Sequence, residues 1–101
     1  MSICFLNDKY LEIQDAKISP LDRGFLFGDA IYEVIIALNK KPFELDAHIE
    51  RLKKNISKLK YSIDDQLNFV EIVSEIISKN KNSNQVIYIQ ISRGTDQIRD
   101  H

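Results

Sequence analysis

The sequence has 101 residues, a length that suits one domain and is too short for two ordinary ones. Apolar residues make up 44% of the chain, which is enough for a hydrophobic core and argues against disorder. The 14 Lys and Arg residues against 15 Asp and Glu residues give a net charge of -1, so a basic nucleic-acid surface is not expected.

Cysteine usage and hydropathy bound the class further. Cys4 is the only cysteine, so neither a disulfide framework nor a cysteine-based metal site is expected, and its apolar neighbours predict a buried thiol. The N-terminal residues lack a signal-peptide pattern, and no apolar run approaches the roughly 20 residues of a membrane span. We therefore expect a cytoplasmic protein with no membrane partner.

The first third of the chain predicts strands and turns. Residues 3–6 (ICFL) and 10–13 (YLEI) flank a polar Asn-Asp-Lys loop, which predicts a hairpin. Residues 17–24 contain Pro, Asp and Gly, which predicts an irregular connection. Residues 32–38 predict a strand, ended by a turn over 39–42.

The middle of the chain changes to a helical period. Apolar residues spaced four and three apart predict one helix from Leu45, with Asp46 as its N-cap. This stripe consists of Leu45, Ile49, Leu52, Ile56, Leu59 and Ile63. A second helix is predicted over 64–79, with Leu67, Val70, Val73 and Ile77 on its buried side.

A polar loop over 79–84 and a strand over 85–92 (QVIYIQIS) complete the pattern. Strands and helices are segregated rather than alternating, which predicts an α+β fold with two helices packed on one side of a sheet. The strand over 32–38 is apolar on both faces, and such strands are normally covered on both sides. Because the two helices supply one cover, we expect another domain or subunit to supply the other.

Several residues could carry chemistry, and each has a structural alternative. Alternation places Tyr32 and Glu33 on opposite faces of their strand. Taken alone, Tyr32 reads as a core aromatic or a pocket residue, Glu33 as half of an ion pair, and Gly28-Asp29 as a turn.

Two further positions suit anions. Arg51 borders the buried stripe of the first helix, where it is either a snorkelling side chain or an anion ligand. Arg99 and His101 would point the same way in an extended segment, an arrangement that suits a carboxylate. The alternative for this pair is an exposed polar tail.

These residues fall into motifs. The segments DRGFLFGDAIYEVI, KPFELDAHIERL and YIQISRG, followed by R-D-H, occur in this order over nearly the whole chain. Together they resemble the N-terminal domain of fold-type IV pyridoxal-phosphate aminotransferases. The Arg-x-His ending makes the chain most similar to the D-amino acid (D-alanine) branch of that family.

The resemblance implies roles by position. Arg51 would bind the phosphate of pyridoxal 5'-phosphate, and Tyr32 would line the substrate pocket. Arg99 and His101, with Tyr32, would hold the substrate carboxylate, the first two reaching into the site of a homodimer partner. The substrates would be D-amino acids and 2-oxo acids, and residues 1–101 would form the first of two domains.

The resemblance also implies what this chain lacks. The family's Schiff-base lysine lies in the C-terminal part, so no catalytic residue is expected here and residues 1–101 alone should be inactive. None of the lysines has the apolar surroundings that depress a lysine pKa. Two alternatives stay open: another fold-type IV enzyme (a branched-chain aminotransferase or aminodeoxychorismate lyase), or a non-catalytic binding or dimerisation module.

Overall fold

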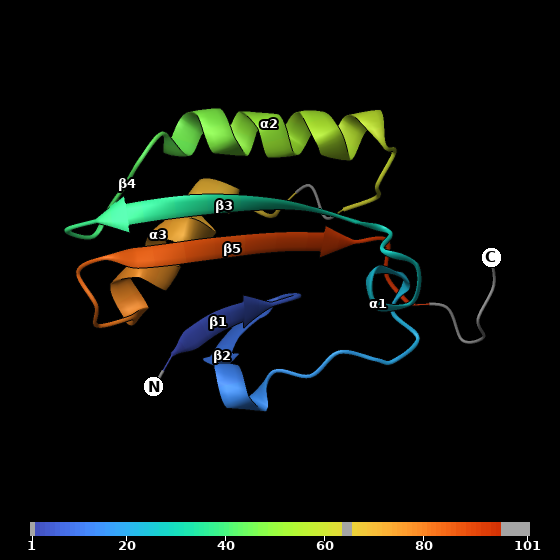
Figure 1. The fold of residues 1–101 in the computed structure, drawn as a ribbon, viewed down its shortest axis with the longest axis horizontal. Helices are drawn as coiled ribbons and strands as arrows, with labels where there is room; N and C mark the ends of the chain where they lie inside the picture. The colour runs from blue at the N-terminus through green and yellow to red at the C-terminus, as the bar shows by residue number, and fades with distance from the viewer. Residues whose placement is uncertain (1, 64–65, 96–101) are drawn as a thin grey trace.

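The N-terminal segment forms the predicted hairpin. The computed structural model describes residues 2–63 and 66–95, beginning with strands β1 (Ile3–Leu6) and β2 (Lys9–Glu12) (Figure 1). The two strands are antiparallel, and Asn7 turns the chain with a φ of 61°, a conformation that asparagine tolerates. A short 3-10 turn, η1 (Ile13–Asp15), follows, and Cys4 is half-buried.

The next element was not predicted. Helix α1 (Arg23–Phe27) lies where the sequence predicts an irregular connection running into an apolar stretch. The Asp22 carboxylate accepts a hydrogen bond from the Gly24 amide at 2.8 Å and caps the helix at its start. Gly28, with a φ of 65°, ends it in the left-handed conformation that favours glycine. Gly28-Asp29 is therefore the turn that leads from a short helix into a strand.

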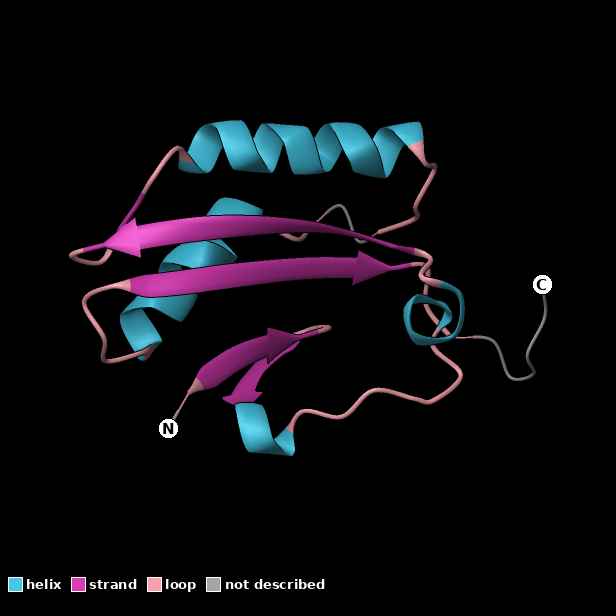
Figure 2. Ribbon diagram, viewed as in Figure 1, coloured by secondary structure: helices cyan, strands magenta, loops and turns pink. Residues whose placement is uncertain are grey.

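The main sheet has three strands in the order β4-β3-β5 (Figure 2). Strand β3 (Ala30–Leu38) pairs antiparallel with β5 (Gln85–Ser92), with Ala30 opposite Ser92. Strand β4 (Lys41–Pro42) pairs only with the last two residues of β3. Both long strands were predicted, and β3 begins two residues earlier than expected.

Helix α2 (Leu45–Lys58) follows the predicted stripe, but its two ends differ from the prediction. Glu44, with a φ of 55°, occupies the cap position, so the expectation that Asp46 caps the helix is wrong. The helix ends at Lys58, which leaves Leu59 outside the stripe and 46% exposed.

Helix α3 (Phe69–Lys79) begins later than predicted, because the Asn68 side chain caps it by accepting from the Glu71 amide at 3.1 Å. Its buried stripe is therefore Phe69, Val73 and Ile77. Val70 was expected on this stripe but lies on the solvent side, so that prediction is wrong.

The core lies between the two long helices and one face of the main sheet. Ile35 of β3, Leu52 of α2 and Val73 of α3 are its most completely buried side chains. In Figure 1, α2 runs alongside β3, and α3 passes behind the sheet. The predicted α+β fold with two helices on one side of a sheet is thus confirmed.

The opposite face of the sheet is open to solvent among the described residues. Alternate residues of β3 and β5 project from it and are exposed, namely Tyr32, Val34, Ile36, Leu38, Val86 and Tyr88. These six residues are called the open face below. An apolar surface of this kind indicates an interaction site, in agreement with the expectation that strand 32–38 needs a second cover.

The hairpin joins the rest of the domain at the end of α3. Asn80 accepts from the Ile3 amide at 2.9 Å and donates to the Ile3 carbonyl at 3.0 Å.

Among the described residues, no helix combines the length and apolar character needed to cross a membrane.

Candidate functional site

The structure places two of the four predicted site residues. Tyr32 and Arg51 lie on β3 and α2, whereas Arg99 and His101 lie outside the described residues. The tyrosine is 63% exposed on the open face, and the arginine side chain is 65% exposed beside the opposite face. The roles of all four therefore remain predictions.

The Arg51 guanidinium is held by a buried carboxylate. Its Nε donates to Glu33 Oε2 at 2.9 Å, and its Nη2 donates to Glu33 Oε1 at 2.8 Å. This two-point geometry fixes the plane of the guanidinium, which a lysine could not reproduce. The expectation that Glu33 is half of an ion pair is confirmed.

His48 is the third member of this cluster. It precedes Arg51 by one helical turn, so both side chains reach the same carboxylate. Its Nδ1 lies 2.8 Å from Glu33 Oε1, and because an ionised carboxylate only accepts, Nδ1 carries the proton.

These donors explain how a carboxylate is accommodated in the core. Only 4% of the Glu33 side chain is exposed, and burial alone would favour its neutral form. The hydrogen bond from Arg51 dominates and, with that from His48, holds the pKa of Glu33 below its ordinary value. Glu33 is thus an anion at neutral pH that orients Arg51.

Glu33 leaves part of the guanidinium available. The carboxylate takes one N–H of Nε and one of Nη2, while Nη1 makes no hydrogen bond with the described residues. Beside it is an open depression of about 400 Å³ lined by Ala47, Glu50, Arg51 and Lys54. The exposed N–H groups suit an anion such as phosphate.

Tyr32 is held in a different way. Its ring stacks on that of Tyr88 from β5, with ring centroids 5.7 Å apart and an interplanar angle of 16°. Both rings belong to the open face, so Tyr32 is not a core aromatic in this chain.

Tyr32 and Arg51 thus lie beside opposite faces of β3. Because β4 pairs with β3 only at Ala37 and Leu38, no described strand covers that edge along residues 30–35. A ligand that contacts both side chains must cross this uncovered edge.

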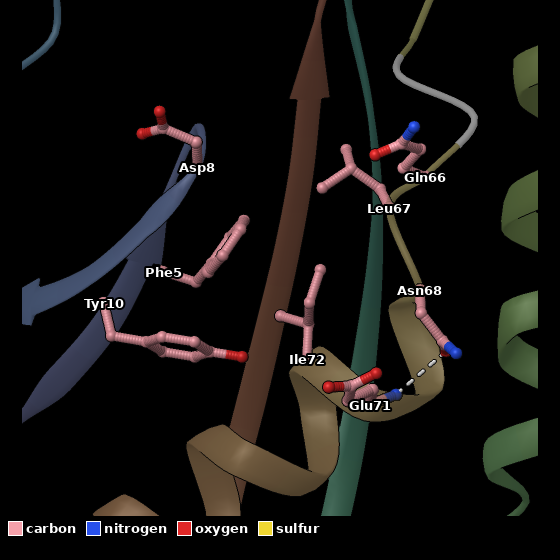
Figure 3. A pocket seen from close by; sticks show the side chains of 8 residues that line it. All are labelled: Phe5, Asp8, Tyr10, Gln66, Leu67, Asn68, Glu71 and Ile72. Atoms are coloured by element: carbon pink, nitrogen blue, oxygen red, sulfur yellow. Dashed lines mark hydrogen bonds between the residues drawn. The ribbon is translucent and has the colours of Figure 1, made fainter.

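A second cleft lies apart from these residues. It has a volume of about 290 Å³ and lies between the hairpin and the start of α3 (Figure 3). Asp8 and Glu71 are the charged residues that line it. Two carboxylates disfavour a phosphorylated ligand, so this cleft is not the candidate site.

Sequence reasoning missed the involvement of His48, although a signal was present. The spacing His48-x-x-Arg51 on a helix places two donors on one side, and a glutamate on a neighbouring strand is their natural acceptor. Predicting that His48 pairs with Glu33 also requires knowing that α2 packs against β3, and sequence spacing does not show this.

Comparisons with known proteins identify the family of this chain. Residues 30–101 match the family profile described as Amino-transferase class IV. The D-alanine aminotransferase of Staphylococcus haemolyticus is 35% identical over 93% of this chain, and that of Staphylococcus aureus is 35% identical over 100% of it. The chain spans about a third of the length of these relatives, 34% and 36% respectively.

Solved structures show the same fold. A fold IV transaminase from Curtobacterium pusillum superposes with a TM-score of 0.72 at 20% identity, over 88% of this chain and 32% of the other. The branched-chain amino acid aminotransferase of Escherichia coli gives a TM-score of 0.75 at 21% identity, over 87% of this chain and 31% of the other. With the profile match covering most of its length, the chain belongs to the class IV aminotransferase family.

Proposed function

We propose that the complete protein transfers amino groups between D-amino acids, D-alanine in particular, and 2-oxo acids. In this proposal residues 1–101 form the first domain, and the Schiff-base lysine lies in the remainder of the protein. The D-alanine aminotransferases of two staphylococci are each 35% identical to this chain over the aligned residues, which supports the choice of substrate.

The observation that carries the proposal is the orientation of Arg51 by Glu33. An arginine that is fixed by a buried carboxylate and still exposes N–H groups is prepared to bind an anion without further ordering. The phosphate of pyridoxal 5'-phosphate is the anion that we assign to it. When bound, this cofactor supplies an electron sink for the charge that develops at the substrate Cα.

The other proposed roles concern the substrate carboxylate. Tyr32 offers a phenolic hydroxyl on the open face, and we propose that Arg99 and His101 of a partner subunit complete the carboxylate site. Where the carboxylate is held relative to the lysine decides which hand of amino acid reacts. The carboxylate site would therefore select the D-isomer as well as bind it.

Two features support a larger, dimeric protein. The open face leaves six apolar or aromatic side chains without a cover among the described residues, which suits packing against a second domain or subunit. Every lysine of this chain is solvent-exposed, whereas a Schiff-base lysine needs a desolvated pocket.

The test is a donor panel with the full-length protein, pyridoxal phosphate and 2-oxoglutarate as acceptor. We expect turnover of D-alanine and no turnover of L-alanine or L-leucine. A protein that transaminates only L-leucine would instead be a branched-chain aminotransferase. A protein that transaminates no amino acid would favour a lyase or a non-catalytic module.

A further inference from the structure

The motif DRGFLFGD contains two aspartates and two glycines to which the proposed function assigns no role. In the structure both aspartates contact the end of β5. Figure 1 shows α1 beside the point where the β5 arrow ends. The contacts there join three segments that are distant in sequence.

Asp29 is the centre of these contacts. Its Oδ2 accepts from Arg93 Nε at 2.8 Å and from Arg23 Nε at 3.2 Å, and its Oδ1 accepts from the Tyr61 hydroxyl at 2.7 Å. Arg93 also lies over the Tyr61 ring, 4.2 Å from its centroid. One carboxylate therefore joins α1, the end of β5 and the segment after α2.

Asp22 binds the other side of the same strand end. Its Oδ2 accepts from the Ser92 hydroxyl at 3.1 Å while its Oδ1 caps α1. The backbones are also paired, since the Arg23 amide donates to the Gly94 carbonyl at 2.7 Å and the Arg93 amide donates to the Asp29 carbonyl at 3.1 Å.

Gly24 is required by the close approach of α1 to β5. A Cβ built on Gly24 would lie 2.9 Å from Ser92 Cβ and 3.0 Å from Asp22 Oδ1. Any side chain at position 24 must therefore push α1 away from β5.

We propose that Asp29, together with Gly24 and Arg93, forms a clamp that positions the chain where it leaves β5, and through it the substrate-binding Arg99 and His101. The backbone of Thr95 forms an antiparallel bridge with that of Asp22, so the chain is held beside α1 as far as Thr95. Arg99 follows only four positions later. Asp29 is then a positioning residue. The proposal rests on the proposed function, because it assumes that Arg99 and His101 bind the substrate carboxylate.

The clamp and the cofactor anchor are separate networks. None of the Asp29 contacts involves Glu33, His48 or Arg51. A change in the clamp should therefore alter substrate affinity and leave cofactor affinity in place, which general destabilisation would not do.

The experiment uses the full-length protein with pyridoxal phosphate and compares Asp29→Asn, Gly24→Ala and Arg93→Gln. The control is Glu75→Gln, which removes an exposed charge of α3 that forms an ion pair with Lys79 at 3.7 Å. We expect the KM for D-alanine to rise on the order of tenfold in each clamp variant, because small displacements of binding groups have effects of this size. The Kd for pyridoxal phosphate should change by less than about twofold, as expected for sites that share no partner.

Two further readouts separate positioning from a merely structural role. In the clamp variants, amide hydrogen exchange should accelerate in the peptides that contain Arg23 and Arg93. The amides of these residues donate the two backbone hydrogen bonds that join α1 and Asp29 to the end of β5. The double variant Asp29→Asn/Arg93→Gln should raise KM by less than the product of the two single effects, because the two side chains share one contact.

The outcomes distinguish the two proposals. An active wild-type protein whose KM for D-alanine is unchanged in Asp29→Asn and Gly24→Ala overturns the positioning role alone. A rise in KM accompanied by parallel losses of cofactor affinity and melting temperature also overturns it, because these changes together show a structural role. A wild-type protein that transaminates no amino acid overturns the proposed function, and the positioning role with it.

Discussion

Arg51 and Glu33 form a two-point ion pair between helix α2 and strand β3, with distances of 2.8 and 2.9 Å, in which the carboxylate is buried and the guanidinium is exposed. This asymmetry gives the two residues different tasks. Glu33 orients the guanidinium from inside the domain, and Arg51 exposes its remaining N–H groups at the surface.

If Arg51 binds the cofactor phosphate, both residues should matter for cofactor affinity. In the full-length protein, we expect Arg51→Ala and Glu33→Gln each to raise the Kd for pyridoxal phosphate about tenfold or more. Arg51→Ala removes the charge-assisted contact with the phosphate, and Glu33→Gln removes the carboxylate that orients the guanidinium. Equilibrium dialysis measures this affinity. Arg51→Lys should recover only part of it, because an ammonium lacks the two-point geometry. Full cofactor occupancy in Arg51→Ala would refute the assignment.

The open face predicts how the isolated chain behaves. Because six apolar or aromatic side chains are exposed on one surface of the sheet, residues 1–101 should self-associate at micromolar concentrations. Light scattering on Ile36→Lys should then give a monomer. The matched control is Ile18→Lys, since Ile18 is equally apolar and 63% exposed but lies outside the sheet. A monomeric wild-type chain would contradict our account of β3.

Acid should weaken the domain through two carboxylates. The pKa of Glu33 is lowered chiefly by Arg51, and that of Asp29 is lowered chiefly by the Tyr61 hydroxyl. Because both folded pKa values lie below the unfolded ones, their contribution is fully present above about pH 5. It is lost as the pH falls through the folded values.

Urea unfolding of the Ile36→Lys chain at pH 7, 5 and 3 measures this loss. The free energy of unfolding should change little from pH 7 to 5 and fall at pH 3, and adding Glu33→Gln should make the fall smaller. An equal fall with and without Glu33→Gln would show that Glu33 does not contribute.

The end of α2 can be tested with two leucines that the sequence pattern treats alike. Leu52 is fully buried, so Leu52→Ala should lower the free energy of unfolding by about 2 to 5 kcal/mol. Leu59 lies beyond the helix and is half exposed, so Leu59→Ala should cost less than about 1 kcal/mol. Equal costs in urea unfolding would place the end of the helix after Leu59.

The sequence was informative where hydrophobic periodicity decides the structure. The strands around Ile35 and Ile87 follow from short apolar runs, and the buried stripe of α2 follows from a spacing of three and four residues. Helix α1 was missed because it is only five residues long, too short to display a helical period, and because glycine lies within it.

The candidate site was only partly visible in the sequence for a related reason. Motif resemblance suggested roles for Arg51 and Tyr32, but not their location beside opposite faces of β3. Nor could spacing show that His48 joins Glu33, or that Asp29 meets Arg93, which is 64 positions away. Such pairs depend on how elements pack, and the sequence pattern around Asp29 indicates only a turn.

The intact mass of the endogenous gene product tests the central claim most directly, because the proposed function requires a lysine beyond residue 101. The chain has a mass of 11.7 kDa and spans 34% of its Staphylococcus haemolyticus relative, so we expect a product about three times as heavy. A mass of 11.7 kDa would contradict the proposed function and leave a binding or dimerisation module as the remaining interpretation.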